Sequence, residues 1–345
     1  MNRKFDVVIG NPPYQKDSTG TATFNMPVYH LFMDAAYEVA TKAVLITPAR
    51  FLFNAGYTPK DWNAKMLSDR HLSVPHYVPN SDDLFPGTDI KGGIVVTYRD
   101  VSREVEPIGV FTKYPELNTI LHKVVETGIH SLTTLGITSG RSYRYTEKTH
   151  EDYPQASELL TAGHHYVVGT SAFQRVPFLY HVTPPSDGHK YVQVLGLDGK
   201  KRAFRWIRSE YLTGPAALSK WKVAVTKANG SGAFGETLST PVVIAPGSAA
   251  TETFITIGAF DTKDEADACL TYVKSKFART MLGVLKITQD NTAKVWTYVP
   301  AQDFTVNSDI AWTKPIPEID AQLYAKYGLH AEEVAFIEAN VNPMD

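Results

Sequence analysis

Apolar and polar positions form blocks along the first hundred residues, and each block has the period of a strand or a helix. Apolar residues run almost without interruption through Phe5–Ile9 and again through Ala43–Thr47, as in strands buried on both faces of a sheet. Between these runs, Val28–Thr41 carries apolar residues at helical spacing. We therefore predict a strand, a helix and a second strand. In such a sheet, a ligand-binding or catalytic site is expected at the carboxyl ends of the strands.

The rest of this stretch predicts one short helix and two further strands. The helix covers Asp61–Asp69, and the strands cover Leu72–Val78 and Ile94–Tyr98, with turn residues between them. Alternation of this kind predicts the α/β class, as a partial doubly wound sheet whose last two strands are antiparallel. We assign residues 1–108 to this first domain.

The pattern changes after about residue 105, where short apolar runs lie between clusters of Gly, Pro and Ser. It predicts a mostly β, α+β second domain at residues 109–345, with a helix over Lys263–Met281 and two short C-terminal helices over Asp320–Asn340, broken at Gly328. The strands that we predict here are Tyr166–Gly169, Tyr191–Leu197, Phe204–Ile207, Trp221–Thr226, Val242–Ala245 and Phe254–Ile257.

Composition fits two domains and leaves nucleic acid open as a partner. The chain has 345 residues, 34 Lys and Arg against 36 Asp and Glu, and a single cysteine, Cys269. One cysteine excludes an internal disulfide framework, and we expect it to be buried. The net charge of −2 hides a local asymmetry, because residues 199–227 hold eight basic residues and one acidic residue, whereas residues 302–345 hold eight acidic and two basic. The histidines have no metal-ligand spacing, so we predict no metal site.

The apolar pattern predicts neither a membrane span nor an export signal. No apolar run approaches the roughly 20 residues that a span requires. Asp6 and then Asn11–Pro13 interrupt the first apolar segment too early for a signal peptide. We therefore expect a cytoplasmic protein without a membrane partner.

The residues that carry chemistry follow the first predicted strand directly, in the order Gly10-Asn11-Pro12-Pro13-Tyr14. Two consecutive prolines fix the backbone and contribute no N–H groups. An amino group on an aromatic ring is a poor nucleophile, because its lone pair is delocalised. The Asn11 side-chain oxygen and the Pro12 carbonyl can accept its two hydrogens, and the Tyr14 ring can stack on a base for roughly 1–3 kcal/mol. The alternative is a proline-bounded strand exit without a role.

These residues also resemble a known family. FDVVIGNPPYQ, at residues 5–15, resembles motif IV of the amino-methyltransferases, in the Asn-Pro-Pro-Tyr form associated with adenine N6 methylation of DNA. Residues 29–36 and 43–48 resemble motifs V and VI. Residues 85–94 resemble the motif VIII region of type IIG restriction–modification methylases, and the chain from about residue 220 resembles the C-terminal part of that group.

The resemblance implies roles for individual residues. Asn11–Tyr14 would form the catalytic loop, and S-adenosylmethionine would be the methyl donor. Gly10 and Phe32 would contact the S-adenosylmethionine, and Tyr98 would close on a flipped adenine. Phe32 can equally be an ordinary core residue of an amphipathic helix, and Tyr98 a plain strand aromatic.

The chain also departs from the family. The resemblance implies a cofactor-binding half ahead of motif IV, yet ten residues precede Asn11 here. The Gly-x-Gly-x-x-Gly string at residues 230–235 lies between two β-like runs with no helix after it, so we expect a flexible hairpin loop. We therefore expect a second polypeptide, or another copy of this chain, to supply that half and to cover the exposed edge of strand Phe5–Ile9.

A methylase that flips a base needs a second surface to grip double-stranded DNA. Basic and aromatic residues alternate over Lys200–Arg208, and a second basic cluster follows Gly140. These residues suit phosphate contacts and, for arginine, guanine edges; the alternative is a solvated strand face. The predicted DNA-binding residues are Arg141, Arg144, Lys200, Lys201, Arg202, Arg205 and Arg208 with Tyr98.

These observations lead to one main hypothesis and two alternatives. The main hypothesis is an adenine N6 methyltransferase component of a restriction–modification system, active with a partner that supplies the cofactor-binding half. The first alternative is a catalytically inactive DNA-binding or specificity protein of such a system, which would bind DNA but not the cofactor. The second is methylation of a protein glutamine amide, since Asn-Pro-Pro-Tyr also serves that chemistry.

Overall fold

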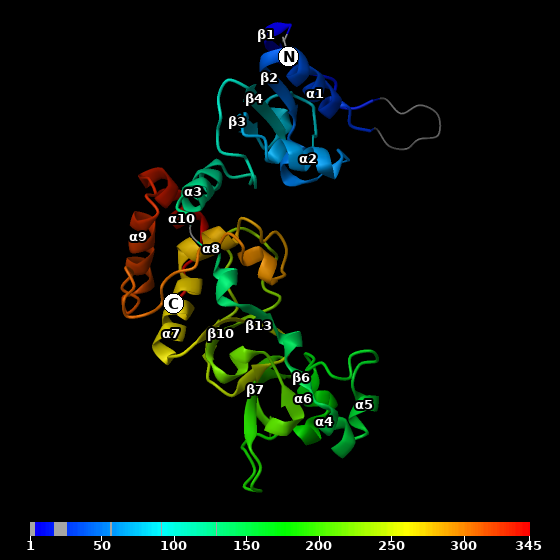
Figure 1. Ribbon diagram of the computed structural model, residues 1–345, viewed down its shortest axis with the longest axis vertical. Helices are drawn as coiled ribbons and strands as arrows, with labels where there is room; N and C mark the ends of the chain where they lie inside the picture. The colour runs from blue at the N-terminus through cyan, green and yellow to red at the C-terminus, as the bar shows by residue number, and fades with distance from the viewer. Residues whose placement is uncertain (1–3, 17–25, 56, 91, 129) are drawn as a thin grey trace. The chain divides into compact units, whose positions relative to one another are not determined.

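The computed structural model describes residues 4–16, 26–55, 57–90, 92–128 and 130–345, and it forms two compact units, Met1–Asn118 and Thr119–Asp345 (Figure 1). The division falls inside helix α3 (Pro115–Glu126) rather than after residue 108. The segment after the last strand of unit 1 packs back onto that unit. The Phe111 ring lies 5.3 Å from the Tyr77 ring and 5.7 Å from the Phe53 ring.

Unit 1 contains a four-stranded sheet in the order β1-β2-β4-β3. Its strands are β1 (Phe5–Gly10), β2 (Ala40–Pro48), β3 (Leu72–Val78) and β4 (Ile94–Asp100). Strands β1 and β2 are parallel, whereas β4 is antiparallel to both β2 and β3. The unit is therefore mixed α/β with the predicted antiparallel pair, but one parallel pair among the described strands does not establish a doubly wound sheet.

Helices α1 (Tyr29–Val39) and α2 (Lys60–Leu67) pack on the same face of this sheet. Met33 of α1 and Met66 of α2 are fully buried in one core with Leu72 and Val95 of the sheet. Burial of side chains of this size contributes roughly 1.5–3 kcal/mol each. The face of the sheet that carries the two helices is thus covered by a hydrophobic core.

The opposite face of the sheet is open along β1. Phe5, Val7 and Ile9 are 56%, 47% and 78% exposed, while Val8, which points the other way, packs against the core. The prediction that this strand is buried on both faces is therefore wrong for the described residues. Its apolar run does mark a strand, but β1 lies at the sheet edge and no described helix of unit 1 covers this face.

Unit 2 is α+β, with its strands distributed over three small sheets of orders β11-β10-β13-β5, β12-β7-β8 and β6-β9. The strands are β5 (Ile137–Ser139), β6 (Arg144–Tyr145), β7 (Tyr191–Asp198), β8 (Lys201–Arg208), β9 (Leu212–Thr213), β10 (Trp221–Thr226), β11 (Val242–Ile244), β12 (Ser248–Ala250) and β13 (Phe254–Phe260). The helices are α4 (Glu147–Asp152), α5 (Ala156–Leu159), α6 (Ala172–Arg175), α7 (Lys263–Lys274), α8 (Lys276–Leu282), α9 (Ile316–Lys326) and α10 (Ala331–Asn340).

Most of the predicted elements of unit 2 are present. The predicted strand over Tyr166–Gly169 is instead irregular and contributes one isolated bridge, between Arg144 and Val167. Cys269 is fully buried, as expected, and Gly328 adopts a left-handed φ of +60° just after α9. No helix in the described parts of the chain is long and apolar enough to span a bilayer.

The predicted helix over 263–281 is two helices, because a cap intervenes. Ser275 has the extended ψ of 150°, and its hydroxyl accepts a hydrogen bond from the Ala278 N–H. Asp320, from α9, accepts hydrogen bonds from the Lys276 and Phe277 N–H groups at 3.0 and 2.9 Å. These contacts satisfy the first N–H groups of α8 and tie it to α9.

Replacing Asp320 by asparagine should flatten the pH dependence of stability. Burial raises the pKa of Asp320 to about 6, although the two N–H hydrogen bonds act to lower it. The protonated carboxyl therefore contributes to the unfolding free energy below about pH 4, and this contribution is lost as the pH rises through 6. The asparagine side chain keeps an acceptor oxygen but does not titrate. Relative to wild type, the Asp320→Asn variant should gain roughly 1–3 kcal/mol in unfolding free energy between pH 4 and pH 7, measured by urea titration. Parallel pH profiles would contradict this assignment.

Candidate functional site

The Asn-Pro-Pro-Tyr loop lies at the carboxyl edge of the unit 1 sheet. Gly10 ends β1 opposite Leu45 of the parallel strand β2, so the residues after it emerge at the same edge as Pro48, where β2 ends. The loop is tied to the start of α1, because the Val28 N–H donates to the Tyr14 carbonyl at 3.1 Å. This is the position at which open α/β sheets bind ligands.

A cavity of about 630 Å³ opens over this loop. That volume accommodates a nucleobase with its sugar. The walls come from four segments of unit 1: the loop itself with the start of α1, the end of β2 with Arg50, the stretch before α2, and the turn before β4. The cavity is lined by Asn11, Pro12, Pro13, Tyr14, Gln15, Pro27, Tyr29, Pro48, Arg50, Tyr57, Asp89 and Ile90.

Asn11 and Tyr14 are neighbours in the lining of the cavity. The Asn11 side chain is exposed, so its carboxamide oxygen is accessible to a bound group. Burial raises the pKa of the Tyr14 hydroxyl, and the neighbouring Asn11 side chain opposes that rise. The hydroxyl oxygen is itself buried. Tyr14 is therefore un-ionised at neutral pH and forms one wall of the cavity.

Tyr29 forms a second, rigid wall. Its ring is 3% exposed and lies 6.4 Å from the Phe51 ring and 6.3 Å from the Trp62 ring. Burial raises the pKa of Tyr29 to about 12, against the opposing effects of a Thr58 hydrogen bond and the Arg50 charge. The phenol is therefore un-ionised at neutral pH and fixed by its aromatic neighbours.

The third wall is the turn that precedes β4, and glycine permits its close packing. Gly93 has a φ of +79°, and a Cβ there would lie 2.3 Å from the Val78 carbonyl oxygen. The Gly93 carbonyl accepts a hydrogen bond from the Ala49 N–H at 3.0 Å, which joins this turn to the end of β2. Asp89 and Ile90 are thereby brought to the cavity.

Two residues with roles implied by the resemblance lie outside this cavity. Tyr98 is opposite Val44 in the middle of the sheet, and its hydroxyl donates to Asp100 at 2.9 Å. The structure does not bring Tyr98 to the Asn-Pro-Pro-Tyr loop; Asp89 and Ile90, from the turn before β4, line the cavity instead. Phe32, on the first turn of α1, is 46% exposed and is not part of the cavity lining.

Arg50 and Tyr29 are cavity residues that the sequence reasoning missed. Arg50 follows the end of β2 by two residues, and Tyr29 is the first residue of α1. The rule that places sites at carboxyl ends of strands could have found Arg50 after Pro48, because that rule applies to β2 as well as to β1.

In unit 2, four of the five predicted DNA-binding arginines make hydrogen bonds or ion pairs within the protein. Arg202 donates to the carbonyls of Ser239 and Thr240, and Arg205 pairs with Asp198. Contacts of this kind orient the guanidinium groups and reduce the charge that they offer to a phosphate.

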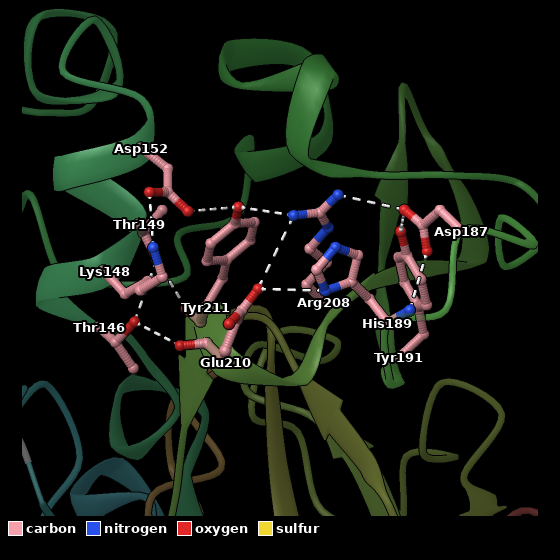
Figure 2. A network of polar contacts seen from close by, with 10 residues as sticks. All are labelled: Thr146, Lys148, Thr149, Asp152, Asp187, His189, Tyr191, Arg208, Glu210 and Tyr211. Carbon is pink, nitrogen blue, oxygen red and sulfur yellow. Dashed lines mark hydrogen bonds and ion pairs between the residues drawn. The ribbon is translucent and has the colours of Figure 1, made fainter.

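Arg208 is the most strongly engaged of these arginines, as Figure 2 shows. Its guanidinium contacts Asp187 at 3.1 Å, the Tyr211 hydroxyl at 3.3 Å and Glu210 at 3.8 Å. The Tyr211 hydroxyl donates in turn to Asp152 at 2.8 Å. This network joins the end of β8 to α4 and to the segment before β7. Arg208 therefore stabilises the packing of unit 2.

The other predicted DNA-binding residues are more accessible. Lys200 and Lys201, at the β7–β8 turn, are exposed, and their side chains make no hydrogen bond or ion pair within the described residues. Arg144 is exposed over the Tyr166 ring at 5.8 Å. Arg141 pairs with Glu252 at 2.7 Å.

The Gly-x-Gly-x-x-Gly string forms the expected loop between β10 and β11, and an internal carboxylate fills it. The Glu236 carboxylate accepts hydrogen bonds from the Ser231 N–H at 2.9 Å and from the Gly232 N–H at 3.1 Å. Hydrogen bonds from Ser231, its hydroxyl foremost, lower the pKa of Glu236 to about 2. The N–H groups that would cradle a phosphate are therefore already satisfied.

The Asn-Pro-Pro-Tyr loop lies inside a segment that matches a known protein family. Residues 1–85 match the Eco57I restriction-modification methylase family. An "Uncharacterized adenine-specific methylase" of Mycoplasma pneumoniae (strain ATCC 29342 / M129 / Subtype 1) is 31% identical over 94 residues. That alignment covers 26% of this chain and 22% of the relative, so the likeness concerns a small part of that protein's length.

Two solved restriction enzymes show weaker likenesses over most of the chain. The type IIG restriction endonuclease BpuSI gives a TM-score of 0.35 at 10% identity, over 97% of this chain and 52% of the enzyme. The type IIL restriction-modification enzyme MmeI, in complex with DNA, gives a TM-score of 0.35 at 8% identity, over 97% of this chain and 56% of the enzyme. The chain therefore spans about half the length of these enzymes, and such scores do not define a shared fold.

Proposed function

We propose that this chain is the catalytic and recognition part of an adenine N6 DNA methyltransferase of a restriction–modification system. One observation carries the proposal: the exposed Asn11 carboxamide and the Tyr14 ring share a base-sized cavity at the carboxyl edge of β1. Asn11, Tyr14 and the other cavity residues up to Tyr57 lie within the segment that matches the methylase family, and Asp89 and Ile90 follow it. A DNA methylase acts where DNA is, so we place it in the cytoplasm.

The chemistry follows from the acceptors in the loop. A flipped adenine enters the cavity and stacks against Tyr14, which contributes roughly 1–3 kcal/mol. The Asn11 Oδ1 and the Pro12 carbonyl accept the two hydrogens of the N6 amino group, so the nitrogen becomes pyramidal and its lone pair becomes available. Pro12 and Pro13 have no N–H groups to compete for these acceptors. S-adenosylmethionine, when bound, supplies the electrophilic methyl group.

The described residues fit one wall of a site for S-adenosylmethionine. Gly10 precedes the catalytic loop, and the half-exposed Phe32 ring lies on the first turn of α1, near the same sheet edge. Ile9, beside them, is 78% exposed along the open edge of the sheet. We propose that a cofactor-binding half, on a second polypeptide or another copy of this chain, covers that edge and completes the site.

Lys200 and Lys201 are proposed as phosphate contacts that grip the duplex. The double variant Lys200→Ala/Lys201→Ala should weaken binding to all duplex sequences alike and reduce the salt slope, d log K/d log [salt], by about 1.8. The measurement is fluorescence anisotropy across a salt series. Lys263→Ala is the matched control, because Lys263 is exposed but paired with Asp267 within α7. An unchanged slope in the double variant would remove these lysines from the interface.

The proposed activity is tested by transfer of tritiated methyl groups from S-adenosylmethionine to duplex DNA. The full chain is assayed alone and with the product of the neighbouring reading frame, and the modified nucleoside is identified by chromatography. We expect N6-methyladenine, with much higher transfer in the presence of the second polypeptide. DNA binding without cofactor binding or transfer under any of these conditions would support the inactive specificity protein instead.

A further inference from the structure

Unit 2 contains a second cleft, of about 290 Å³, next to the ion pair of Arg141 and Glu252. His164 and Arg175 also line this cleft, and Glu252 is the one acidic residue in its lining. Arg175 donates to the Leu159 carbonyl at 3.2 Å and is partly committed to the protein. The Arg141–Glu252 pair is therefore the feature best placed to recognise something in the cleft.

The backbone on both sides of this pair is fixed. A Cβ on Gly140 would lie 2.2 Å from the Thr251 carbonyl oxygen and 2.7 Å from that of Phe254, so only glycine allows the chain segments to pack this closely. The Glu252 N–H donates to the Val168 carbonyl at 2.8 Å. Arg141 and Glu252, each next to one of these contacts, are consequently held opposite one another.

The pair leaves one edge of the arginine available. Nε and Nη2 of Arg141 both contact Oε1 of Glu252, at 2.8 and 2.7 Å. No described residue accepts a hydrogen bond from Nη1, and the Arg141 side chain is 53% exposed. A planar guanidinium held in this way offers two parallel donors, on Nη1 and Nη2, in a fixed direction. These donors match either a phosphate or the O6 and N7 atoms of guanine.

The geometry of the pair decides between these two ligands. Glu252 does not neutralise the site, because the Lys227 Nζ lies 3.7 Å from the same Oε1 and Arg175 lines the same cleft. The surplus of positive charge attracts the DNA backbone whatever its sequence. The two contacts from Glu252 Oε1 fix the direction of Nη1 and Nη2 of Arg141, and direction rather than charge determines the discrimination at a base edge. We propose that Arg141 reads a guanine of the recognition sequence from the major groove, and that Glu252 is the residue that positions it. This inference rests on the proposed function, because it requires unit 2 to bind duplex DNA.

The test is selection of bound duplexes from a randomised library, by the full chain with its second polypeptide where binding requires one. Wild type is compared with Arg141→Ala, Arg141→Lys and Glu252→Gln. The control is Arg70→Ala, because Arg70 is 54% exposed and pairs with Glu104 at 3.3 Å in unit 1. Circular dichroism and thermal unfolding confirm that each variant folds.

We expect a guanine at one position of the wild-type consensus. Both Arg141 variants should lose the preference at that position by about 5- to 150-fold, because lysine cannot donate two parallel hydrogen bonds. Glu252→Gln should weaken the same preference, and Arg70→Ala should leave the consensus unchanged. Other positions should keep their preferences in every variant.

Three outcomes would overturn the inference. A uniform loss of affinity in Arg141→Ala that Arg141→Lys restores would show a phosphate contact. An unchanged consensus in all of the variants, or a wild type without any preference for guanine, would show that Arg141 reads no base. A wild type that does not bind duplex DNA at all would refute the proposed function first, which separates that failure from failure of this inference alone.

Discussion

Replacing Asn11 by alanine should reduce methyl transfer by at least about 100-fold while leaving duplex affinity unchanged. The variant removes an acceptor that acts on the amino group only as its nitrogen becomes pyramidal, so the loss falls on the transition state rather than on binding. Removal of one positioned hydrogen-bonding group of this kind costs about 10²–10³ in rate. Tritiated methyl transfer gives the rate, and fluorescence anisotropy with duplex DNA gives the affinity.

Asn307→Ala is the matched control for this prediction, because Asn307 is an exposed asparagine of unit 2, outside the cavity. It should transfer methyl groups at the wild-type rate. Asn11 is exposed as well, so its replacement is not expected to unfold unit 1, and equal melting temperatures would verify this. Transfer within a few-fold of wild type in Asn11→Ala would refute the role that we give to this loop.

The sequence predicts strand β1 and the exit of the chain from it well, because their signals are local. A run of apolar residues ending at Gly10 specifies a strand, and two prolines specify a rigid exit from it. Leu72–Val78 and Trp221–Thr226 are likewise strands over the predicted residues, each bounded by strong turn signals. For such elements, the neighbouring residues contain most of the information that sets the fold.

Tyr98 illustrates what the local pattern cannot supply. The sequence predicts that β3 and β4 are antiparallel to one another, but not which of the two is antiparallel to β2. Because β4 is antiparallel to β2, its first residue, Ile94, lies opposite Pro48 at the site edge, and Tyr98 lies four residues further away. The preceding turn, with Asp89 and Ile90, therefore lines the cavity. Strand direction depends on pairing between distant segments, which no short window records.

The basic run of β8 shows a second limit of the same kind. Arg202, Arg205 and Arg208 are counted as free charge in the sequence, yet Arg202 and Arg208 each have a partner that is distant along the chain. Asp187 precedes Arg208 by about 20 residues, and the carbonyls that hold Arg202 follow it by nearly 40. Charge counts in a window therefore overstate the positive surface that is available to DNA.

Substitution of Val7 by aspartate should abolish association through the open edge of the sheet. Phe5, Val7 and Ile9 are about half exposed or more on that face, and covering them contributes roughly 2–5 kcal/mol. An aspartate in the middle of the strand removes part of this gain and adds an unpaired charge to the interface. We expect wild type to self-associate at micromolar concentrations in sedimentation velocity, and Val7→Asp to be monomeric.

The same variant should lose methyl transfer in the complex with the second polypeptide, since a loss of about 3 kcal/mol weakens association by roughly 100-fold. Val306→Asp is the matched control, because Val306 is 98% exposed in unit 2 and covers no sheet edge. It should associate and transfer like wild type. Val7 lies four residues before Asn11, so DNA affinity and far-ultraviolet circular dichroism should be unchanged in Val7→Asp. The prediction would be contradicted by a wild type that stays monomeric at tens of micromolar with a native spectrum, and whose methyl transfer no second polypeptide increases. Strand β1 would then be stable without a binding partner.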